Sequence, residues 1–445
     1  LHADYDDAFV AYWNGHEIAR ENIGYRGTRP AFDDETDYFR EARLYRNVLP
    51  ENFLLNQQEL QQSLQIGTNT LAIQVHNDGL TSLDLSAIFF LSFGITDTTQ
   101  NYSTTPEWFV PPIIFETSNL PLVKINTQNT AIFDEPRIIA NLQITNNENG
   151  TINSITDVAN VYDGQISIEK RGSSSQTRFP KKSYRFETQT ADGENNNVSL
   201  LGLPAENDFI LYAPYSDKSL LRNVLMFDIG RKMGHYTPRT RYCELLLNGK
   251  YQGIYVLMEN IKRDKHRVDI EKLTAEEEEE NDITGGYILK LDKRTSSENE
   301  DFWYSEYLPP TTTDRPTFFQ YHYPKAAEIS AAQKEYIQSY IHAFESELDG
   351  ENFKDETTGY RAYIDVPSFI DFLLANELSY NVDGMRISTF LYKKHIDEGG
   401  KLCMGPLWDF NLAFGNGYDC NTQNEVGFLK DFNVVCPNSS YHVPF

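Results

Sequence analysis

The order of strand-like and helix-like segments after residue 118 most constrains the fold. Apolar and polar residues alternate in several segments between 118 and 262, as in half-buried strands, and one helical pattern, 216–234, interrupts them. Two longer amphipathic patterns follow between residues 330 and 384, and then a strand hairpin. Strands first and helices later predict an α+β domain. The position of the first helix further predicts a two-lobed arrangement.

Residues 1–98 have a different residue pattern, which predicts an all-β, jelly-roll-like sandwich. An Asn-Gly pair at Asn14-Gly15 lies between two strand patterns, which is a strong hairpin signal. A Thr-rich segment that ends in two prolines separates this part from the rest. We therefore predict a multi-domain chain, in this order: a β-sandwich at 1–98, a linker at 99–117, and an α+β domain at 118–445 with lobes at about 118–262 and 283–445.

Charge and hydropathy exclude some partners. The chain carries 65 acidic against 39 basic residues, a formal net charge of −26. Such a surface repels nucleic acid and anionic lipid, so neither is an expected partner. The longest apolar run is shorter than the roughly 18 residues that a membrane span needs, so we expect no span.

The four cysteines divide into two kinds. Cys243 and Cys403 lie in apolar, strand-like contexts, which predicts buried free thiols. Cys420 and Cys436 flank a loop; a bridge between them would add about 3 kcal/mol and would place the chain in an oxidising compartment. The spacings predict no zinc site.

Two aspartates frame the predicted hairpin. Asp383 precedes it, and Asp409 ends it in "GPLWDFNLAFGN". Phosphoryl transfer needs one carboxylate to orient the acceptor hydroxyl and another to hold a metal ion on the phosphates. The competing interpretation is that both are ordinary turn residues, and Gly384 directly after Asp383 favours a turn.

Further stretches between residues 160 and 420 occur in the order found in one known family. They are "IEKRGSSSQTRFPKKSYRFE", "DKSLLRNVLMFDIGRKMG", "LNGKYQGIYVLMENIKRDKHRV", "GGYILKLDK", "NELSYNVDGMR" and "GPLWDFNLAFGN". With them, the chain resembles the CotH kinase family of atypical secreted protein kinases. "DDAFVAYWNGHEIARENIG" and "GTNTLAIQVHN" resemble the galactose-binding-like modules of secreted bacterial enzymes.

The resemblance implies a function and a location. It implies ATP-dependent phosphorylation of Ser or Thr on a surface or coat protein, with Mg²⁺ or Mn²⁺ as cofactor and Ca²⁺ as a further candidate. It also implies a secreted or cell-surface, bacterial-type location, and carbohydrate as a partner of the N-terminal module. Two alternatives stay open: a non-catalytic adhesion or scaffold protein, and AMP transfer from ATP.

The resemblance also assigns the two aspartates. Asp409 matches the metal-binding aspartate, and Asp383 matches the aspartate that orients the acceptor hydroxyl. A typical catalytic loop has a second metal-binding Asn five residues after that aspartate, where this chain has Ser388. Asn411 or Asn381 would supply an amide oxygen instead. The serine also raises the prospect of a pseudokinase.

Lys182 is the candidate for the lysine that pairs with phosphate. It shares strand parity with Tyr184 and Phe186, whereas Lys181 points the other way. Arg222 and Asn223 are candidate supports for Lys182. The competing interpretation is two solvated surface lysines.

The remaining candidates would contact nucleotide. "RGSSSQ" (171–176) lies where a kinase has its glycine-rich loop, but it has a single glycine. Glu259 and Asn260 end a strand where a hinge would meet adenine, although a structural role for Glu259 is an equal alternative. The candidate nucleotide-binding residues are Arg171, Ser173, Ser174, Glu259, Asn260 and Arg386.

The two ends of the chain carry a further expectation. Leu1 is preceded by no Met or targeting signal, which we interpret as a mature or trimmed chain. Galactose-binding-like modules usually begin with earlier strands, and CotH proteins usually continue past the final "YHVPF". We therefore expect an incomplete first module and a shortened C-terminal lobe.

Overall fold

The computed structural model describes residues 1–46, 48–55, 57–79, 82, 84–93, 114–148, 150–293, 302–309, 316–417, 428–436 and 439–444. The chain forms two compact units. The first unit comprises Leu1–Pro180, Tyr184–Asn197 and Tyr242–Ile254, and the second comprises Lys181–Ser183, Val198–Arg241 and Tyr255–Phe445. Most of the predicted linker 99–117 lies outside the described residues, so the predicted domain boundaries stay predictions.

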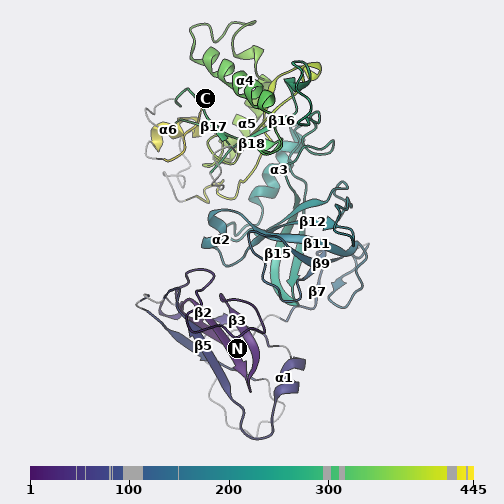
Figure 1. Ribbon diagram of the computed structural model, residues 1–445, viewed down its shortest axis with the longest axis vertical. Helices are drawn as coiled ribbons and strands as arrows, with labels where there is room; N and C mark the ends of the chain where they lie inside the picture. Colours follow the sequence, from purple (N-terminus) through teal and green to yellow (C-terminus); the bar gives the residue numbers. More distant parts are fainter. Residues whose placement is uncertain are drawn as a thin grey trace. The chain divides into compact units, whose positions relative to one another are not determined.

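The N-terminal part is β-rich, as predicted. Its described strands form two antiparallel three-stranded sheets (Figure 1). Asn14 and Gly15 turn the β2–β3 hairpin with φ of 49° and 83°, a conformation that Asn and Gly adopt readily. The sheets are β4 (Glu51–Asn52), β1 (His2–Tyr5), β6 (Ala87–Phe90), and β3 (His16–Glu21), β2 (Ala8–Trp13), β5 (Leu71–His76); a short helix, α1 (Gln57–Ser63), lies between β4 and β5 in sequence.

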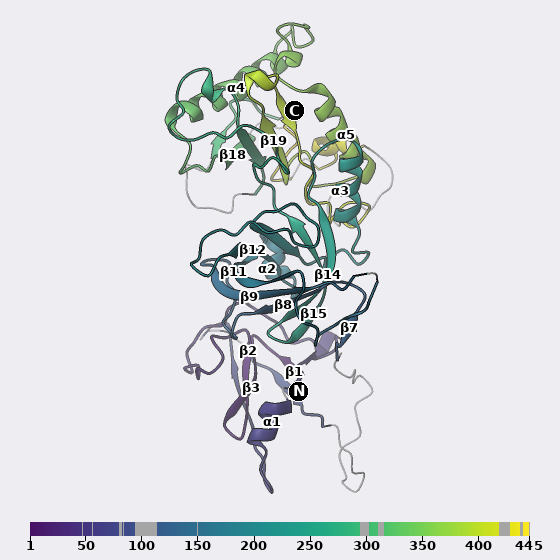
Figure 2. The same ribbon diagram turned by 90° about the vertical axis from the view of Figure 1, so that its right-hand side faces the viewer.

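Seven described strands then close into a barrel in the order β11-β12-β13-β15-β14-β8-β9 (Figure 2). A parallel pairing of β14 with β8 contributes to the closure and places Glu244 opposite Leu122. Alternate residues of each strand point inward, so residues such as Ile168, Phe186 and Phe209 are fully buried. The strands are β8 (Leu122–Asn126), β9 (Ile138–Thr145), β11 (Tyr162–Arg171), β12 (Ser183–Gln189), β13 (Asp208–Tyr212), β14 (Thr240–Leu247) and β15 (Lys250–Glu259).

The last of these strands, β15, begins at Lys250 and ends at Glu259. It pairs with β13, and Phe209 lies opposite Glu259. Two short strands outside the barrel, β7 (Thr117–Ser118) and β10 (Asn153–Ser154), pair with each other. The short helix α2 (Ser174–Arg178) follows β11.

The predicted α+β two-lobed kinase-like arrangement is therefore wrong. Most of the described secondary-structure elements are strands, and the region predicted as the first lobe is largely a closed barrel. The period-two pattern indicated most of the barrel strands but not β13, and it does not show which strands pair with one another. The β14–β8 pairing joins segments more than a hundred residues apart in sequence, and nothing local to either strand indicates it.

The second unit contains a sheet and the longest helices. Described strands form an antiparallel sheet in the order β17 (Phe302–Tyr304), β18 (Phe318–Tyr323), β16 (Tyr287–Leu291), β19 (Thr389–Lys393), β20 (Leu402–Met404). The helices are α3 (Arg222–Lys232), α4 (Ala331–Asp349) and α5 (Val366–Ser379), followed near the C-terminus by the short α6 (Phe432–Val435). Helices α4 and α5 form where the sequence predicted helices, with Ser330 and Gln333 capping α4 and Asp365 capping α5. Helix α3 begins at Arg222 rather than at residue 216, and α6 was not predicted.

Helix α4 packs its apolar side into the core that supports this sheet. Ile337, Ile341 and Phe344 of α4 share a buried cluster with Leu289 of β16 and Leu391 of β19. This core holds β19 in a fixed position. The segments that enter β19 and leave β20 therefore start from fixed positions at one end of the sheet.

The cysteine predictions have a mixed outcome. Cys243 and Cys403 are free and buried, as predicted. Cys436 is disulfide-bonded, while Cys420, its predicted partner, lies outside the described residues.

Across the described residues, none of the helices has both the length and the apolar character that a membrane crossing requires.

Burial in the barrel predicts that two isoleucines contribute differently to the free energy of unfolding. Ile168 on β11 is fully buried, whereas Ile139 on the neighbouring β9 is 57% exposed. We expect Ile168→Ala to lower the free energy of unfolding by about 2–5 kcal/mol because it leaves a cavity. Ile139→Ala should change it by no more than about 0.5 kcal/mol. Urea unfolding followed by tryptophan fluorescence measures both, and equal effects would contradict the described barrel interior.

Candidate functional site

The hairpin β19–β20 brings the two predicted aspartate loops to one end of the sheet. Leu391 lies opposite Met404, and the pairing continues with a bond from Gly405 N to Phe390 O of 2.8 Å. The segment that enters β19 carries Asp383, and the segment that leaves β20 carries Asp409. A bond of 2.6 Å from Phe414 N to Ser379 O joins the second segment to the end of α5. The two loops are thus neighbours.

The first residues of α3 hold the Asp409 loop. Asn223, which is buried, accepts a hydrogen bond of 2.5 Å from the backbone N–H of Phe410. Arg222 donates from Nε to the carbonyl of Ala413 at 2.9 Å and from Nη2 to that of Phe414 at 3.4 Å. These bonds fix the backbone around Asp409, which has a left-handed φ of 58°. The role expected for Arg222 and Asn223 was support of Lys182; the hydrogen bonds described here go to the Asp409 loop.

Asp217 orients Arg222 in turn. Its carboxylate accepts from Arg222 N at 2.9 Å and from Ser219 Oγ at 2.6 Å, and it forms an ion pair with the Arg222 guanidinium. Burial raises the pKa of Asp217, but the hydrogen bonds from Ser219 and Arg222 outweigh burial and hold the pKa below its usual value. The carboxylate therefore stays charged and keeps Arg222 aimed at the loop.

Asp383 lies in a tight turn with an ion pair of its own. Its Oδ1 is 2.9 Å from Nη2 of Arg386, and both side chains are largely buried. Arg386 also donates to the carbonyl of Val382 at 2.6 Å and to Oγ of Ser439 at 3.2 Å. The structure thus brings together Asp383 and Arg386, two of the residues predicted from the sequence. Arg386 here positions the carboxylate of Asp383.

Gly384 allows the Asp383 turn to lie against α5. A Cβ at this position would be 1.9 Å from Oδ1 of Asn376, which is fully buried. Only glycine permits this approach, so the Asp-Gly pair is needed for packing. Packing against α5 therefore explains the Asp-Gly pair in the sequence. It is compatible with a chemical role for Asp383.

Two buried amide oxygens lie in these loops without a hydrogen-bond partner among the described residues. They are Oδ1 of Asn411, two residues after Asp409, and Oδ1 of Asn381, two residues before Asp383. Buried polar atoms are nearly always paired, so each needs an explanation. Carboxylate and amide oxygens are ligands that hard divalent cations prefer. The residues present therefore fit a Mg²⁺ or Mn²⁺ ion.

Ser388, in the place of the expected second asparagine, has an unusual backbone. Its φ is 51° and its side chain is 7% exposed. Asparagine and glycine adopt this left-handed conformation at lower cost than serine. The backbone conformation at this position therefore suits an asparagine.

Lys182 directly precedes β12 and belongs to the same compact unit as Asp383 and Asp409. Tyr184 and Phe186, which share its strand parity, are buried as expected. The carbonyl of Lys182 accepts a bond of 2.9 Å from Tyr255 Oη, and Nζ of Lys181 lies 4.5 Å from the centre of the Tyr255 ring. Both lysines therefore lie beside a buried tyrosine of the barrel.

Arg171, Ser173 and Ser174 lie in the first unit, at the end of β11 and the start of α2. Their segment forms a short helical turn. Gln176 closes it with bonds to the carbonyl of Gly172 at 2.7 Å and to Asp134 Oδ1 at 2.8 Å. Their proposed contact with phosphate stays a prediction.

Glu259 and Asn260 are engaged in protein contacts. Glu259 is fully buried and pairs with Arg239 at 3.0 Å. Asn260 donates to Asp208 Oδ2 at 3.0 Å, and its carbonyl accepts from Arg267 Nη1 at 2.9 Å. These contacts support the structural role that was the alternative for Glu259.

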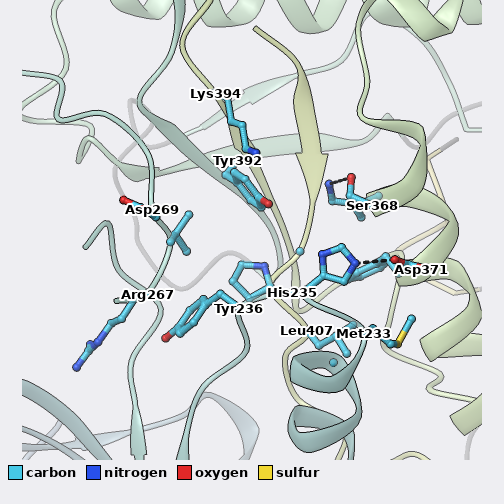
Figure 3. A pocket seen from close by; sticks show the side chains of 16 residues that line it. Met233, His235, Tyr236, Arg267, Asp269, Ser368, Asp371, Tyr392, Lys394 and Leu407 are labelled. Atoms are coloured by element: carbon cyan, nitrogen blue, oxygen red, sulfur yellow. Dashed lines mark hydrogen bonds and ion pairs between the residues drawn. The ribbon is translucent and has the colours of Figure 1, made fainter. Parts of the chain in front are cut away.

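A cavity of about 270 Å³ adjoins the Asp409 loop (Figure 3). Gly405, Pro406 and Leu407 of the loop line it, together with His235, whose Nε2 is 2.7 Å from Asp371 Oδ2. Sequence reasoning missed His235, Asp371 and the other polar lining residues. They come from the segment after α3, from Arg267 and Asp269, from α5, and from β19 with the residue after it, and no local pattern connects them.

Comparison with known proteins assigns the chain to a class. Residues 168–437, more than half of the chain, match the model of the family described as CotH kinase protein. The chain therefore belongs to the CotH kinase protein family, as the sequence resemblance implied.

One curated relative is the inner spore coat protein H of Bacillus subtilis (strain 168). It is 24% identical to this chain over 272 residues. The match covers 56% of this chain and 59% of that protein, so the chain spans well under two thirds of its relative. The name says that the relative is a spore coat protein.

The contact between α3 and the Asp409 loop predicts a stability effect. Asn223→Ala leaves the buried N–H of Phe410 without an acceptor, so we expect the free energy of unfolding to fall by about 1–3 kcal/mol. Leu225→Ala, at an exposed position of the same helix, is the control and should change it by about 0.5 kcal/mol or less. Chemical denaturation measures both. If the two variants are equally stable, Asn223 does not hold the loop.

Proposed function

We propose that this chain is an ATP- and divalent-metal-dependent protein kinase that phosphorylates Ser or Thr of surface or extracytoplasmic proteins. The observation that carries the proposal is the pair of aspartate loops at one end of β19–β20. Close to Asp409 in sequence lies the amide oxygen of Asn411, which has no hydrogen-bond partner in the described part of the chain. Membership of the CotH kinase protein family supports it.

Asp409 and Asn411 would hold the metal ion, and Asn381 is a further amide ligand in reach of the Asp383 turn. When bound, a divalent cation supplies neutralisation of the charge on the nucleotide phosphates. The chain contributes the rigid loop. Asn223 and Arg222 fix its backbone before any ligand arrives, so little reorganisation is needed at the moment of transfer.

Asp383 would orient the acceptor hydroxyl and accept its hydrogen bond. Arg386 holds this carboxylate at 2.9 Å and so fixes its orientation. Lys182 would pair with the phosphates as a point charge, as lysines do at many phosphate sites. Transfer then depends mainly on positioning and electrostatics, which is the general character of phosphoryl transfer.

The location and partners of the chain are part of the same proposal. The relative is a spore coat protein, and a formal charge of −26 favours partners that are not nucleic acid or anionic lipid. We infer a secreted or surface location, a surface or coat protein as substrate, and attachment, to carbohydrate for instance, through the galactose-binding-like N-terminal module.

Transfer of label from ATP tests the proposal. With γ-labelled ATP and Mg²⁺ or Mn²⁺, we expect label on the chain itself or on casein as a generic acceptor. Asp409→Ala should lower the rate about 100-fold or more, as loss of a main electrostatic group does. Label from α-labelled ATP instead would indicate AMP transfer. Absence of both labels, together with no metal-dependent binding of ADP, would contradict the proposal and favour a scaffold.

Ser388 gives a second, finer prediction. Ser388→Asn supplies an amide oxygen in a backbone conformation that asparagine tolerates, so we expect transfer to rise by about tenfold, or roughly 1.4 kcal/mol of barrier. Ser388→Gly is the matched control, because it relieves the same backbone strain without adding a ligand. A rise in both variants would show that strain at this position, not a missing ligand, limits the rate.

A further inference from the structure

Three carboxylates meet in the N-terminal part of the first unit, in a separate region of the sequence from the aspartate loops. Asp6, Glu41 and Asp84 each place an oxygen within 4.8 Å of the others. Asp6 follows β1 and Asp84 precedes β6, and Tyr5 lies opposite Ala87 in that pair of strands. The pairing of β1 with β6 thus brings two acids together, and Glu41 joins them from the segment before the turn at Leu44–Arg46.

Asp6 is the unusual member of this cluster. It is 4% exposed, and its Oδ1 is buried without a hydrogen-bond partner among the described residues. Its neighbour Asp7 is also buried, but it accepts backbone bonds from Arg40 at 2.9 Å and from Asp78 at 2.7 Å. Asp7 therefore has a structural role that is complete within the protein, whereas Oδ1 of Asp6 has no partner among the described residues.

The charged groups that shift the pKa of Asp6 are carboxylates. Burial first, and then the carboxylates of Asp7, Asp84 and Glu41, raise the pKa of Asp6, with only a backbone hydrogen bond from Ala42 opposing them. The hydrogen bonds of the other two acids, Glu41 and Asp84, go to residues nearby in the sequence. Glu41 Oε2 accepts from Tyr45 Oη at 2.9 Å and from Arg46 at 3.4 Å, and Asp84 Oδ1 accepts from Ser82 Oγ at 2.9 Å.

We propose that Asp6, Glu41 and Asp84 bind a divalent cation of the Ca²⁺ type. Ca²⁺ takes six to eight oxygen ligands in flexible geometry, and carboxylates from three separate segments suit it, with water completing the shell. Mg²⁺ requires a stricter octahedron and is the poorer fit. The ion ties the β1–β2 turn, the segment at Glu41 and the start of β6 together. Its role is structural, and it is independent of the metal proposed at Asp409.

Calorimetric titration of the full chain with Ca²⁺ tests the site. Asp409→Ala serves as the background, so that binding at the aspartate loops does not contribute. We expect one Ca²⁺ to bind, and Asp84→Asn, at an exposed position, to weaken binding at least about tenfold. Asp192→Asn, another exposed acid of the first unit, is the matched control and should leave binding unchanged.

Thermal unfolding with and without Ca²⁺ gives a second readout, in which the direction of the change in the unfolding midpoint is informative. Without Ca²⁺, Asp6→Asn removes a repelled buried charge, so we expect its midpoint to rise above that of the parent chain. With Ca²⁺, the midpoint of the parent chain should rise and that of Asp6→Asn should not.

Two results would overturn the proposal. One is Ca²⁺ binding in Asp84→Asn that equals binding in Asp192→Asn. The other is a midpoint for Asp6→Asn that falls equally with and without Ca²⁺, since this is the behaviour of a plain structural acid. Neither result depends on whether the chain transfers phosphate, so failure of this site is distinguishable from failure of the kinase proposal.

Discussion

The bond between Asn223 and the backbone of Phe410 is the contact on which the candidate site depends. It joins the start of α3 to the loop that leaves the hairpin β19–β20, and Arg222 extends it to the next turn of that loop. Residues almost two hundred positions apart thereby fix the backbone of Asp409. A metal ligand in a loop is useful only if its direction is set beforehand, because reorganisation during the reaction is costly. Asp217, by holding Arg222, is part of the same arrangement.

The sequence predicted features that depend on neighbouring residues, but it did not predict contacts between segments far apart in the chain. Alternating apolar residues identified strands such as β11 and β12, and amphipathic patterns identified α4 and α5, because these signals act within a few residues. The barrel was missed, since its closure depends on the parallel pairing of β14 with β8. The cavity beside Leu407 was missed for a similar reason. Its polar residues, His235 and Asp371, meet only in the folded chain.

At the site itself, residue types were easier to predict than their roles. Asp383 and Asp409 come to one end of a hairpin, which their positions in the sequence indicated. The nucleotide contact predicted for Arg386 stays a prediction, and the side chain pairs with Asp383. Glu259 was considered for a hinge, but it is fully buried against Arg239. Charged residues at strand ends have the same appearance in the sequence whether they face a ligand or an ion-pair partner. Only the packing around them separates the two.

The central claim is that Asp409 and Asn411 hold a divalent cation on the phosphates of ATP. Anomalous diffraction from crystals grown with Mn²⁺ and a non-hydrolysable ATP analogue tests it most directly. The account predicts a manganese peak about 2.0–2.2 Å from an Asp409 carboxylate oxygen and from Oδ1 of Asn411, in contact with the analogue's phosphates. Density for the analogue with its manganese bound elsewhere, or with no manganese at this loop, would contradict it.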